Sequence, residues 1–297
     1  QADALARIVW NHTQHHRFLH SSVYVVEGVK PVQEAINLGL SIREIVVTEK
    51  MAPMLENCHY NVVVVSDDVF KYISEEITPQ GALAVVYRPL GDLKAPTGSA
   101  LLLDGVADPT NVGAIIRTAV ASGYTDIYMT EQCADAYSQK AVRCSMSGVF
   151  RANVMRASID KILQVVNLPM CVADMDGTNV FELKNDSDIC LVIGNEGHGV
   201  SKQVREKASI TVSIPMQNVE SLNAGVAGGI LMYFICFDRT LIKEKDFVFA
   251  DFMFQCYENL ITDFKRRKRM IYDYIQQHEK TLKMLKKRFK SSESLMP

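Results

Sequence analysis

The chain has 297 residues and a formal net charge of −2, with 48% hydrophobic and 22% charged residues. These proportions are those of an ordinary globular protein, so they exclude a disordered, collagen-like or coiled-coil chain. At about 100–200 residues per domain the length predicts two domains, and no apolar run reaches the roughly 18 residues of a membrane span.

Residues 1–90 predict a small α/β domain. Four short β-branched or apolar runs predict strands, at 23–27, 45–47, 62–65 and 82–86. Two stretches with helical periodicity lie among them, at 31–38 and 67–73. Pro31 suits the first turn of a helix, and Gly39 suits the position just past its end. The following stretch is rich in Pro and Gly, so we place a linker at 91–99.

Residues 100–240 predict a second α/β domain. Its candidate strands are the runs at 100–104, 126–130, 169–174, 189–194 and 210–215. Helical patterns alternate with them, at 112–122, 138–145, 158–166 and 202–208. Alternating strands and helices predict a mainly parallel sheet that is covered on both faces. Strands buried on both faces should be continuously apolar, as 101–103 and 190–193 are.

This domain ends with an apolar helix, predicted at 222–237, that is rich in small residues. Three of them are Gly225, Gly228 and Gly229, and glycine inside a helix costs about 1 kcal/mol relative to alanine. Their presence indicates that another backbone or a ligand approaches the helix closely. Ordinary core packing is the alternative explanation.

Residues 241–297 predict a helical, basic C-terminal extension. Between Asp263 and Lys290, eleven basic residues stand against three acidic ones, a net of +8 that leaves −10 for the rest of the chain. A basic segment on an acidic body is typical of a tail that binds nucleic acid or another anionic partner. The solvated face of an ordinary helix is the alternative.

The seven cysteines form no C-x-x-C pair and no zinc-type cluster with histidine. They indicate buried thiols in a reducing compartment, so we expect a cytoplasmic protein without a metal site. His15 and His16 have no acidic or cysteine partner beside them in the sequence, which favours a surface or RNA-facing role. The first 14 residues lack the zones of a secretory signal. An organellar protein that has lost its targeting segment is the alternative.

Three polar segments adjoin strands of the second domain. Residues 108–119 (DPTNVGAIIRTA) place Asn111 and Arg117 on the first turns of a helix. Residues 193–199 (IGNEGHG), which include Glu196, follow an apolar strand and predict a ligand loop at the carboxyl end of a parallel strand. Residues 214–225 (IPMQNVESLNAG) carry Ser221 and Asn223 at the start of the glycine-rich helix.

Each of these residues has an ordinary structural interpretation when it is taken alone. Asn111 and Ser221 suit helix caps, Arg117 suits a surface charge, and Glu196 suits a solvated loop. The glycine-rich loop also suggests a dinucleotide site, but neither domain has G-x-G-x-x-G after its first strand. The G-x-S-x-G and P-loop patterns are absent too, which argues against α/β-hydrolases and nucleoside triphosphatases.

Together and in this order, the three segments resemble the three motifs of the SpoU (TrmH-like) family of RNA ribose 2′-O-methyltransferases. The motifs correspond to 111–119, 191–197 and 214–223, and the resemblance spans 101–237. Residues 18–88 also resemble the family's N-terminal substrate-binding domain, notably at 24–28 (YVVEG). The C-terminal extension resembles nothing in the family.

The resemblance implies a SPOUT fold, in which the C-terminal part of the parallel sheet is threaded into a trefoil knot. The connection rules of ordinary sheets do not predict such a knot. The resemblance also implies that S-adenosylmethionine binds in the knot, against Gly194, Gly197, Ile214, Met216 and Leu222. The family is typically dimeric, with the active site completed across the interface, so we expect a homodimer.

The implied reaction is attack by a ribose 2′-hydroxyl on the methyl group of S-adenosylmethionine. Arg117 stands at the position of the family arginine that acts on this hydroxyl. A guanidinium keeps its proton up to a pKa above about 12, so we expect it to grip the adjacent phosphate and stabilise the developing alkoxide. Asn111 and Glu196 are expected to fix Arg117 and the substrate loop. Ser221 and Asn223 are expected to order the cofactor pocket and the ribose.

The added N-terminal domain favours large-subunit rRNA over tRNA as the partner, because such domains bind structured RNA through shape and backbone contacts. Three alternatives stay open at this point. They are a tRNA 2′-O-methyltransferase, a non-catalytic RNA-binding or ribosome-assembly protein with the same fold, and a doubly wound nucleotide- or NAD-binding enzyme. The missing phosphate-loop glycines disfavour the last of them.

Overall fold

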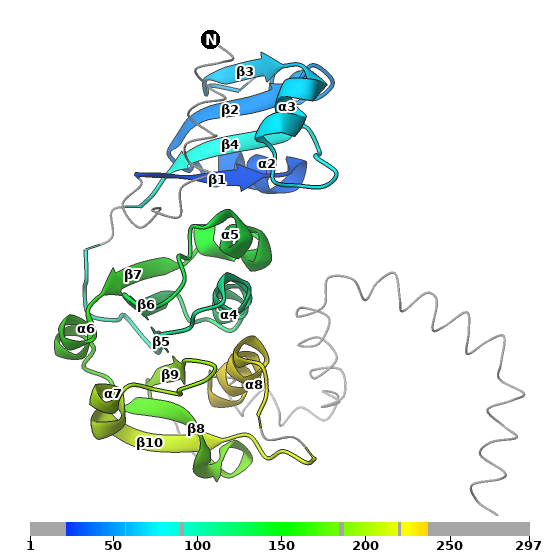
Figure 1. The fold of residues 1–297 in the computed structure, drawn as a ribbon. Coiled ribbons are helices and arrows are strands. Elements are labelled where there is room, and N and C mark those ends of the chain that lie inside the picture. The colour runs from blue at the N-terminus through cyan, green and yellow to red at the C-terminus, as the bar shows by residue number, and fades with distance from the viewer. Residues whose placement is uncertain (1–21, 57, 90–91, 184–186, 219–220, 237–297) are drawn as a thin grey trace, which may run out of the picture. The chain divides into compact units, whose positions relative to one another are not determined.

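The computed structural model describes residues 22–56, 58–89, 92–183, 187–218 and 221–236 (Figure 1). The predicted basic extension, His15 and His16, and the last residue of the predicted glycine-rich helix lie outside these residues. No helix among the described residues is long and apolar enough to cross a membrane.

Residues 22–89 contain a four-stranded mixed sheet. Its strands are β1 (Val23–Glu27), β2 (Ile42–Thr48), β3 (Val62–Val65) and β4 (Ala82–Tyr87), in the order β1-β4-β2-β3. β4 is antiparallel to β1 and β2, whereas β2 and β3 are parallel. The helical segments are α2 (Val29–Asn37), the 3₁₀ turn η2 (Ala52–Leu55) and α3 (Asp67–Ile73). All the strands and helices predicted here are confirmed, and β2 is longer than expected.

Residues 100–236 contain a six-stranded sheet in which all neighbouring strands are parallel. The strands are β5 (Ala100–Asp104), β6 (Asp126–Thr130), β7 (Asn153–Ala157), β8 (Met170–Asn179), β9 (Cys190–Gly194) and β10 (Ala208–Ser213). Their order is β10-β8-β9-β5-β6-β7. The predicted parallel sheet is confirmed. β7 was not predicted, because its sequence NVMRA mixes polar and apolar residues, as suits a strand at the edge of the sheet.

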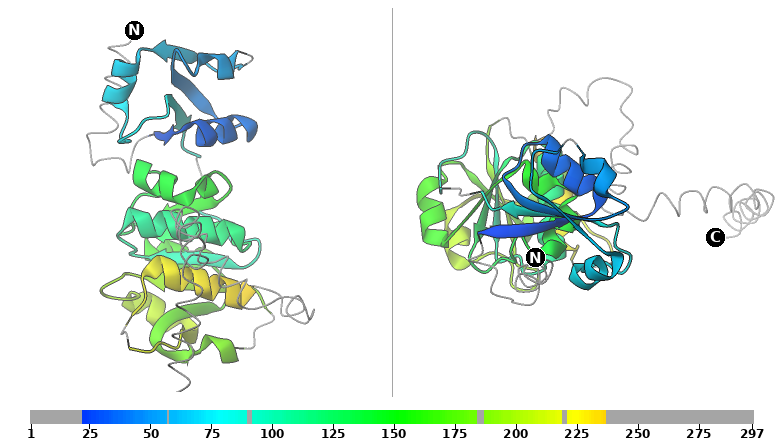
Figure 2. Two further views of the ribbon diagram at one scale, coloured as in Figure 1. Left: turned by 90° about the vertical axis from the view of Figure 1, so that its right-hand side faces the viewer. Right: turned by 90° about the horizontal axis from the view of Figure 1, so that it is seen from above.

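Helices cover both faces of this sheet (Figures 1 and 2). The helical segments are α4 (Pro109–Ala121), α5 (Gln139–Ser145), η3 (Gly148–Phe150), α6 (Ile159–Val165), η4 (Val180–Glu182), α7 (Lys202–Lys207) and α8 (Ala224–Cys236). β5 shows how the two layers arise, because its side chains alternate between faces. Leu101 packs in the same core as Ile115 of α4, whereas Leu102 packs in the core that contains Ile162 of α6 and Val204 of α7.

The three polar segments follow the carboxyl ends of β5, β9 and β10. β5 and β9 are neighbours in register, with Asp104 opposite Gly194, so the loops after them begin side by side. In an open parallel sheet, ligands bind at this edge, outside the carboxyl ends of the strands. The topology therefore brings together segments that are far apart in the sequence.

Candidate functional site

A chain of side-chain hydrogen bonds joins the three polar segments. Asn111 Nδ2 donates to Glu196 Oε1 over 2.8 Å, and Asn223 Nδ2 donates to Asn111 Oδ1 over 2.8 Å. Glu196 Oε2 also accepts a hydrogen bond from the backbone N–H of Ala107, over 3.2 Å. We call Asn111, Glu196 and Asn223 the amide–carboxylate network. It ties the loops after β5, β9 and β10 to one another.

The helix caps around this network differ from the ordinary interpretation of the sequence. Asp108 caps α4 by accepting a hydrogen bond from Thr110 N, so Asn111 is not the cap. At α8, Asn223 Oδ1 accepts hydrogen bonds from Gly225 N and Val226 N, and Ser221 lies before this capping position. Interpreting Asn111 and Ser221 as caps is therefore wrong. Asn111 is 6% exposed, and its side chain is used wholly for contacts between loops.

Asn195 is a further structural residue of the site that the sequence reasoning missed. Its Nδ2 donates to the Gly105 carbonyl over 2.8 Å, and its Oδ1 accepts from Gly197 N and His198 N over 2.9 and 3.0 Å. An Asn whose side chain accepts from its own backbone two residues on forms an Asx turn, and Asn inside a glycine-rich stretch is the sequence signal for one. Asn195 thus holds the loop after β9 against the loop after β5.

Gly194 is required at the end of β9 by close backbone packing. A Cβ atom at this position would lie 2.4 Å from the carbonyl carbon of Gly199, which is too close for any side chain. At Gly197 the nearest atom to such a Cβ would be Asn195 Oδ1, at 3.6 Å. Gly194 therefore allows the backbone of the loop to pack closely on itself, whereas a side chain would fit at Gly197.

Residues of the loops after β9 and β10 line a cavity of about 360 Å³, which we call the motif cavity. All five residues predicted to bind the cofactor line it: Gly194, Gly197, Ile214, Met216 and Leu222. Glu196 and Ser221 line it too, whereas Arg117, Asn111 and Asn223 do not. The sequence reasoning missed Asp174, Met175 and Arg205 in the lining, because they belong to β8 and α7 rather than to the three motifs.

The chemistry of this lining fits S-adenosylmethionine better than a dinucleotide. Apolar side chains and loop backbone make up most of the walls, as in pockets that hold a flat ring system. Asp174 and Glu196 contribute two carboxylates, and Arg205 is the one Lys or Arg among the described residues of the lining. A diphosphate would meet these carboxylates unfavourably, whereas a sulfonium cation would be attracted to them.

Glu196 is held in its charged form. Burial acts to raise its pKa, but the hydrogen bonds from Asn111 and from the backbone N–H groups of Ala107 and Asp108 outweigh burial and hold the pKa below its ordinary value. Glu196 is therefore a carboxylate at neutral pH. Its oxygens accept hydrogen bonds from these donors, so Glu196 is a poor candidate for a general base.

Arg117 lies on the third turn of α4, further along the helix than Asn111. A Cβ atom at Gly148 would come within 3.0 Å of Arg117 Cα, so η3 packs directly on α4 at this point. Burial lowers the pKa of Arg117 from its ordinary value, and the guanidinium stays charged at neutral pH. Arg117 thus adjoins α4's contact with η3 rather than the motif cavity.

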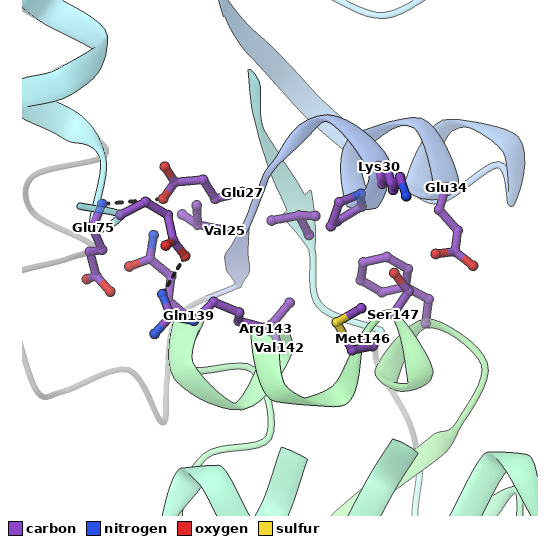
Figure 3. A pocket seen from close by; sticks show the side chains of 14 residues that line it. Val25, Glu27, Lys30, Glu34, Glu75, Gln139, Val142, Arg143, Met146 and Ser147 are labelled. Carbon is purple, nitrogen blue, oxygen red and sulfur yellow. Dashed lines mark hydrogen bonds and ion pairs between the residues drawn. The ribbon is translucent and has the colours of Figure 1, made fainter. Parts of the chain in front are cut away.

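A second cavity, of about 200 Å³, lies between the four-stranded sheet and α5 (Figure 3). Its charged lining includes Glu27, Glu34, Glu75 and Glu76 together with Lys30 and Arg143. This excess of carboxylates would repel the phosphates of RNA. We refer to it as the second cavity, and it is a less suitable candidate for the site of an RNA enzyme.

Two family models match the chain. Residues 98–233 match the SpoU rRNA Methylase family, and residues 12–84 match the MRM3-like substrate binding domain. Among curated proteins, the chain is 30% identical over 228 residues to the 23S rRNA (guanosine(2553)-2′-O)-methyltransferase RlmP of Bacillus subtilis. That match covers 75% of this chain and 91% of the relative.

Solved structures show the same arrangement of elements. A putative RNA methyltransferase of the TrmH family from Porphyromonas gingivalis is 31% identical, with a TM-score of 0.68 over 77% of this chain and 95% of that one. The SpoU methyltransferase AviRb from Streptomyces viridochromogenes, in complex with AdoMet, shares the fold with a TM-score of 0.70 at 24% identity. That match covers 80% of this chain and 99% of AviRb.

Proposed function

This chain belongs to the SpoU rRNA Methylase family and is an RNA methyltransferase that uses S-adenosylmethionine. We propose that its target is the ribose 2′-hydroxyl of a guanosine in large-subunit rRNA. The similarity to RlmP over most of both chains supports the target. The match of residues 12–84 to a substrate-binding domain supports an rRNA-binding role for the four-stranded sheet. The amide–carboxylate network is the single structural observation that carries the proposal, because it assembles three dispersed segments around one cavity.

The cofactor supplies a methyl group on a sulfonium, which is already a strong electrophile. In our proposal Gly194, Gly197, Ile214, Met216 and Leu222 hold it in the motif cavity, whose lining they share. Ser221 lies in the same lining and orders the rim. The protein's task is then alignment of the two reactants and activation of a poor nucleophile.

Arg117 carries the activation in this proposal. As a permanent cation it grips the phosphate beside the target ribose and stabilises negative charge on the 2′-oxygen during attack. Asn111, Glu196 and Asn223 are positioning residues, since their polar atoms are engaged with one another and with loop backbone. The arrangement supports electrostatic positioning more than proton abstraction by Glu196.

We further propose that the enzyme acts as a homodimer with a knotted C-terminal region, in the cytoplasm. Arg117 is absent from the lining of the motif cavity, so in this proposal Arg117 of a second copy completes the active site. Gly177 of β8 packs tightly on β10, because a Cβ there would lie 2.5 Å from the backbone carbonyl carbon of Val212. Free thiols at Cys58, Cys133, Cys144, Cys171 and Cys190 accord with a reducing compartment.

Arg117→Ala is expected to abolish methyl transfer to rRNA while S-adenosylmethionine affinity stays within a few fold of the wild type. Single-turnover methylation and calorimetric titration measure the two quantities. Arg117→Lys keeps the charge but loses the bidentate grip, so it should retain part of the rate. Unchanged single-turnover methylation by Arg117→Ala would overturn the role of Arg117. Mapping ribose methylation in rRNA from cells with and without the protein identifies the nucleotide.

A further inference from the structure

A charged pair stands in the wall of the motif cavity, outside the three motifs. Arg205 Nη1 lies 2.8 Å from Asp174 Oδ2, and both residues line the cavity. Asp174 belongs to β8 and Arg205 to α7, so the pair comes from elements outside the three motif segments. Among the described residues, neither side chain forms a hydrogen bond or an ion pair with Asn111, Glu196 or Asn223.

The pair is built to present one carboxylate and one guanidinium at different depths. The Asp174 side chain is 18% exposed, and its Oδ1 accepts a hydrogen bond from Asp176 N over 3.3 Å, which fixes the carboxylate. The Arg205 side chain is 59% exposed. Its Nη2 would lie 3.8 Å from a Cβ placed on Gly199, so the guanidinium reaches from Asp174 over the loop after β9.

Stability alone does not explain why these charges stand there. An exposed ion pair contributes little to stability, and α7 has an ordinary one in Lys202–Glu206, at 3.7 Å and 86% and 65% exposed. The Asp174 carboxylate, at 18% exposed, has lost most of its hydration, and this loss has to be compensated by opposite charge. The position of Asp174 and Arg205 therefore points to a ligand that carries both signs of charge.

We propose that Asp174 and Arg205 bind the amino-acid end of the cofactor, with Asp174 receiving its ammonium group and Arg205 its carboxylate. A zwitterion offers the opposite sign to each member of the pair, and a guanidinium binds a carboxylate in a bidentate manner. This inference rests on the proposed use of S-adenosylmethionine, and it adds two specificity-determining residues from outside the motifs. The apolar part of the cavity then remains for the adenosine.

Calorimetric titration of the full chain with two ligands tests this assignment. S-adenosylhomocysteine carries the amino-acid end, whereas 5′-methylthioadenosine lacks it and keeps the adenosine. Arg205→Gln and Asp174→Asn should each weaken S-adenosylhomocysteine binding about tenfold or more, as expected for a lost hydrogen bond to a charged group. Both should leave 5′-methylthioadenosine binding within a factor of about two. Lys202→Gln removes the same charge from α7 and should change neither affinity.

Binding of 5′-methylthioadenosine also reports whether each variant keeps its folded cavity. Equal losses of affinity for both ligands, or no loss for either, would overturn the proposal, because the pair would then not bind the amino-acid end of the cofactor. If the wild-type protein bound neither ligand, the cofactor assignment itself would fail, and this inference would fail with it. If the wild type bound S-adenosylhomocysteine and the two variants bound it equally well, only the role of Asp174 and Arg205 would be contradicted.

Discussion

The motif cavity and the second cavity are surrounded by different kinds of contact. Around the motif cavity, neutral amides, one carboxylate and backbone N–H groups form short hydrogen bonds within a single sheet domain. Around the second cavity, ion pairs join the four-stranded sheet to the region of α5 and η3 (Figure 3). Arg143 pairs with Glu76 at 2.5 Å, and Arg151 pairs with Glu34 at 2.6 Å.

The most buried of these contacts centres on Arg88, which follows β4. Its guanidinium binds Asp135 through two hydrogen bonds, with Nη1–Oδ1 at 3.2 Å and Nη2–Oδ2 at 2.5 Å, and the two side chains are 15% and 13% exposed. The guanidinium carbon also lies 5.1 Å from the centre of the Tyr137 ring, which in turn packs on Tyr24 at 4.9 Å. Hydrogen bonds therefore join the motif loops to one another, whereas charge pairs and rings join the four-stranded sheet to the region of α5.

Arg88→Ala is expected to have the largest effect, a loss of about 3 kcal/mol in the free energy of unfolding. The substitution leaves the Asp135 carboxylate buried without its cation and removes the contact with Tyr137. Urea denaturation of the full chain measures the loss. Lys202→Ala, which breaks an exposed pair, is the control and should cost about 0.5 kcal/mol or less. Equal losses in the two variants would contradict the distinction between buried and exposed pairs.

Asn111→Ala should cost about 2 kcal/mol of stability, because it removes two hydrogen bonds of a buried side chain, one to Glu196 and one from Asn223. Cofactor affinity should fall with it, since the loop after β9 loses a tie to α4. In a double-mutant cycle with Asn223→Ala, the double variant should lose less stability than the sum of the losses in the two single variants. Fully additive losses would mean that the two amides do not act as one network.

The smallest expected effect is a pH dependence of opposite sign at the two cavities. Burial raises the pKa of Glu27 above its ordinary 4.5, despite hydrogen bonds from Ser74 and from Glu75 N. Its contribution to stability is therefore fully present below pH 4.5 and is lost as the pH rises through the raised pKa. Glu196 has a lowered pKa, so its contribution is present above 4.5 and is lost as the pH falls.

Glu27→Gln and Glu196→Gln separate these two contributions. The free energy of unfolding of Glu27→Gln, taken relative to the wild type, should rise as the pH increases above 4.5. That of Glu196→Gln, taken in the same way, should fall as the pH increases toward 4.5 from below. Urea titrations at several pH values measure both slopes. Slopes of the same sign would show that the two carboxyl groups do not differ as their surroundings indicate.

Much of the architecture could be predicted because it depends on local pattern. The apolar runs at 101–103 and 190–193 predicted buried parallel strands, and they are the central strands β5 and β9. Prediction was weaker for β7, whose place at the edge of the sheet removes the continuous apolar signal. The residues predicted to bind the cofactor could be named because they belong to motif loops, and they line one cavity.

By itself, the sequence determined the alternation of strands and helices and the three polar loops. It also determined the resemblance to the SpoU family, which implies methyl transfer to a ribose 2′-hydroxyl. Tertiary structure alone decided which side chains meet. Asn111 lies 85 residues from Glu196 and 112 from Asn223, and their hydrogen bonds exist only because parallel strands bring the carboxyl ends of β5, β9 and β10 to one edge. The same holds for Asp174 and Arg205, whose pairing across β8 and α7 leaves no local signal. Periodicity records burial along one segment, whereas a binding site is a property of several segments at once.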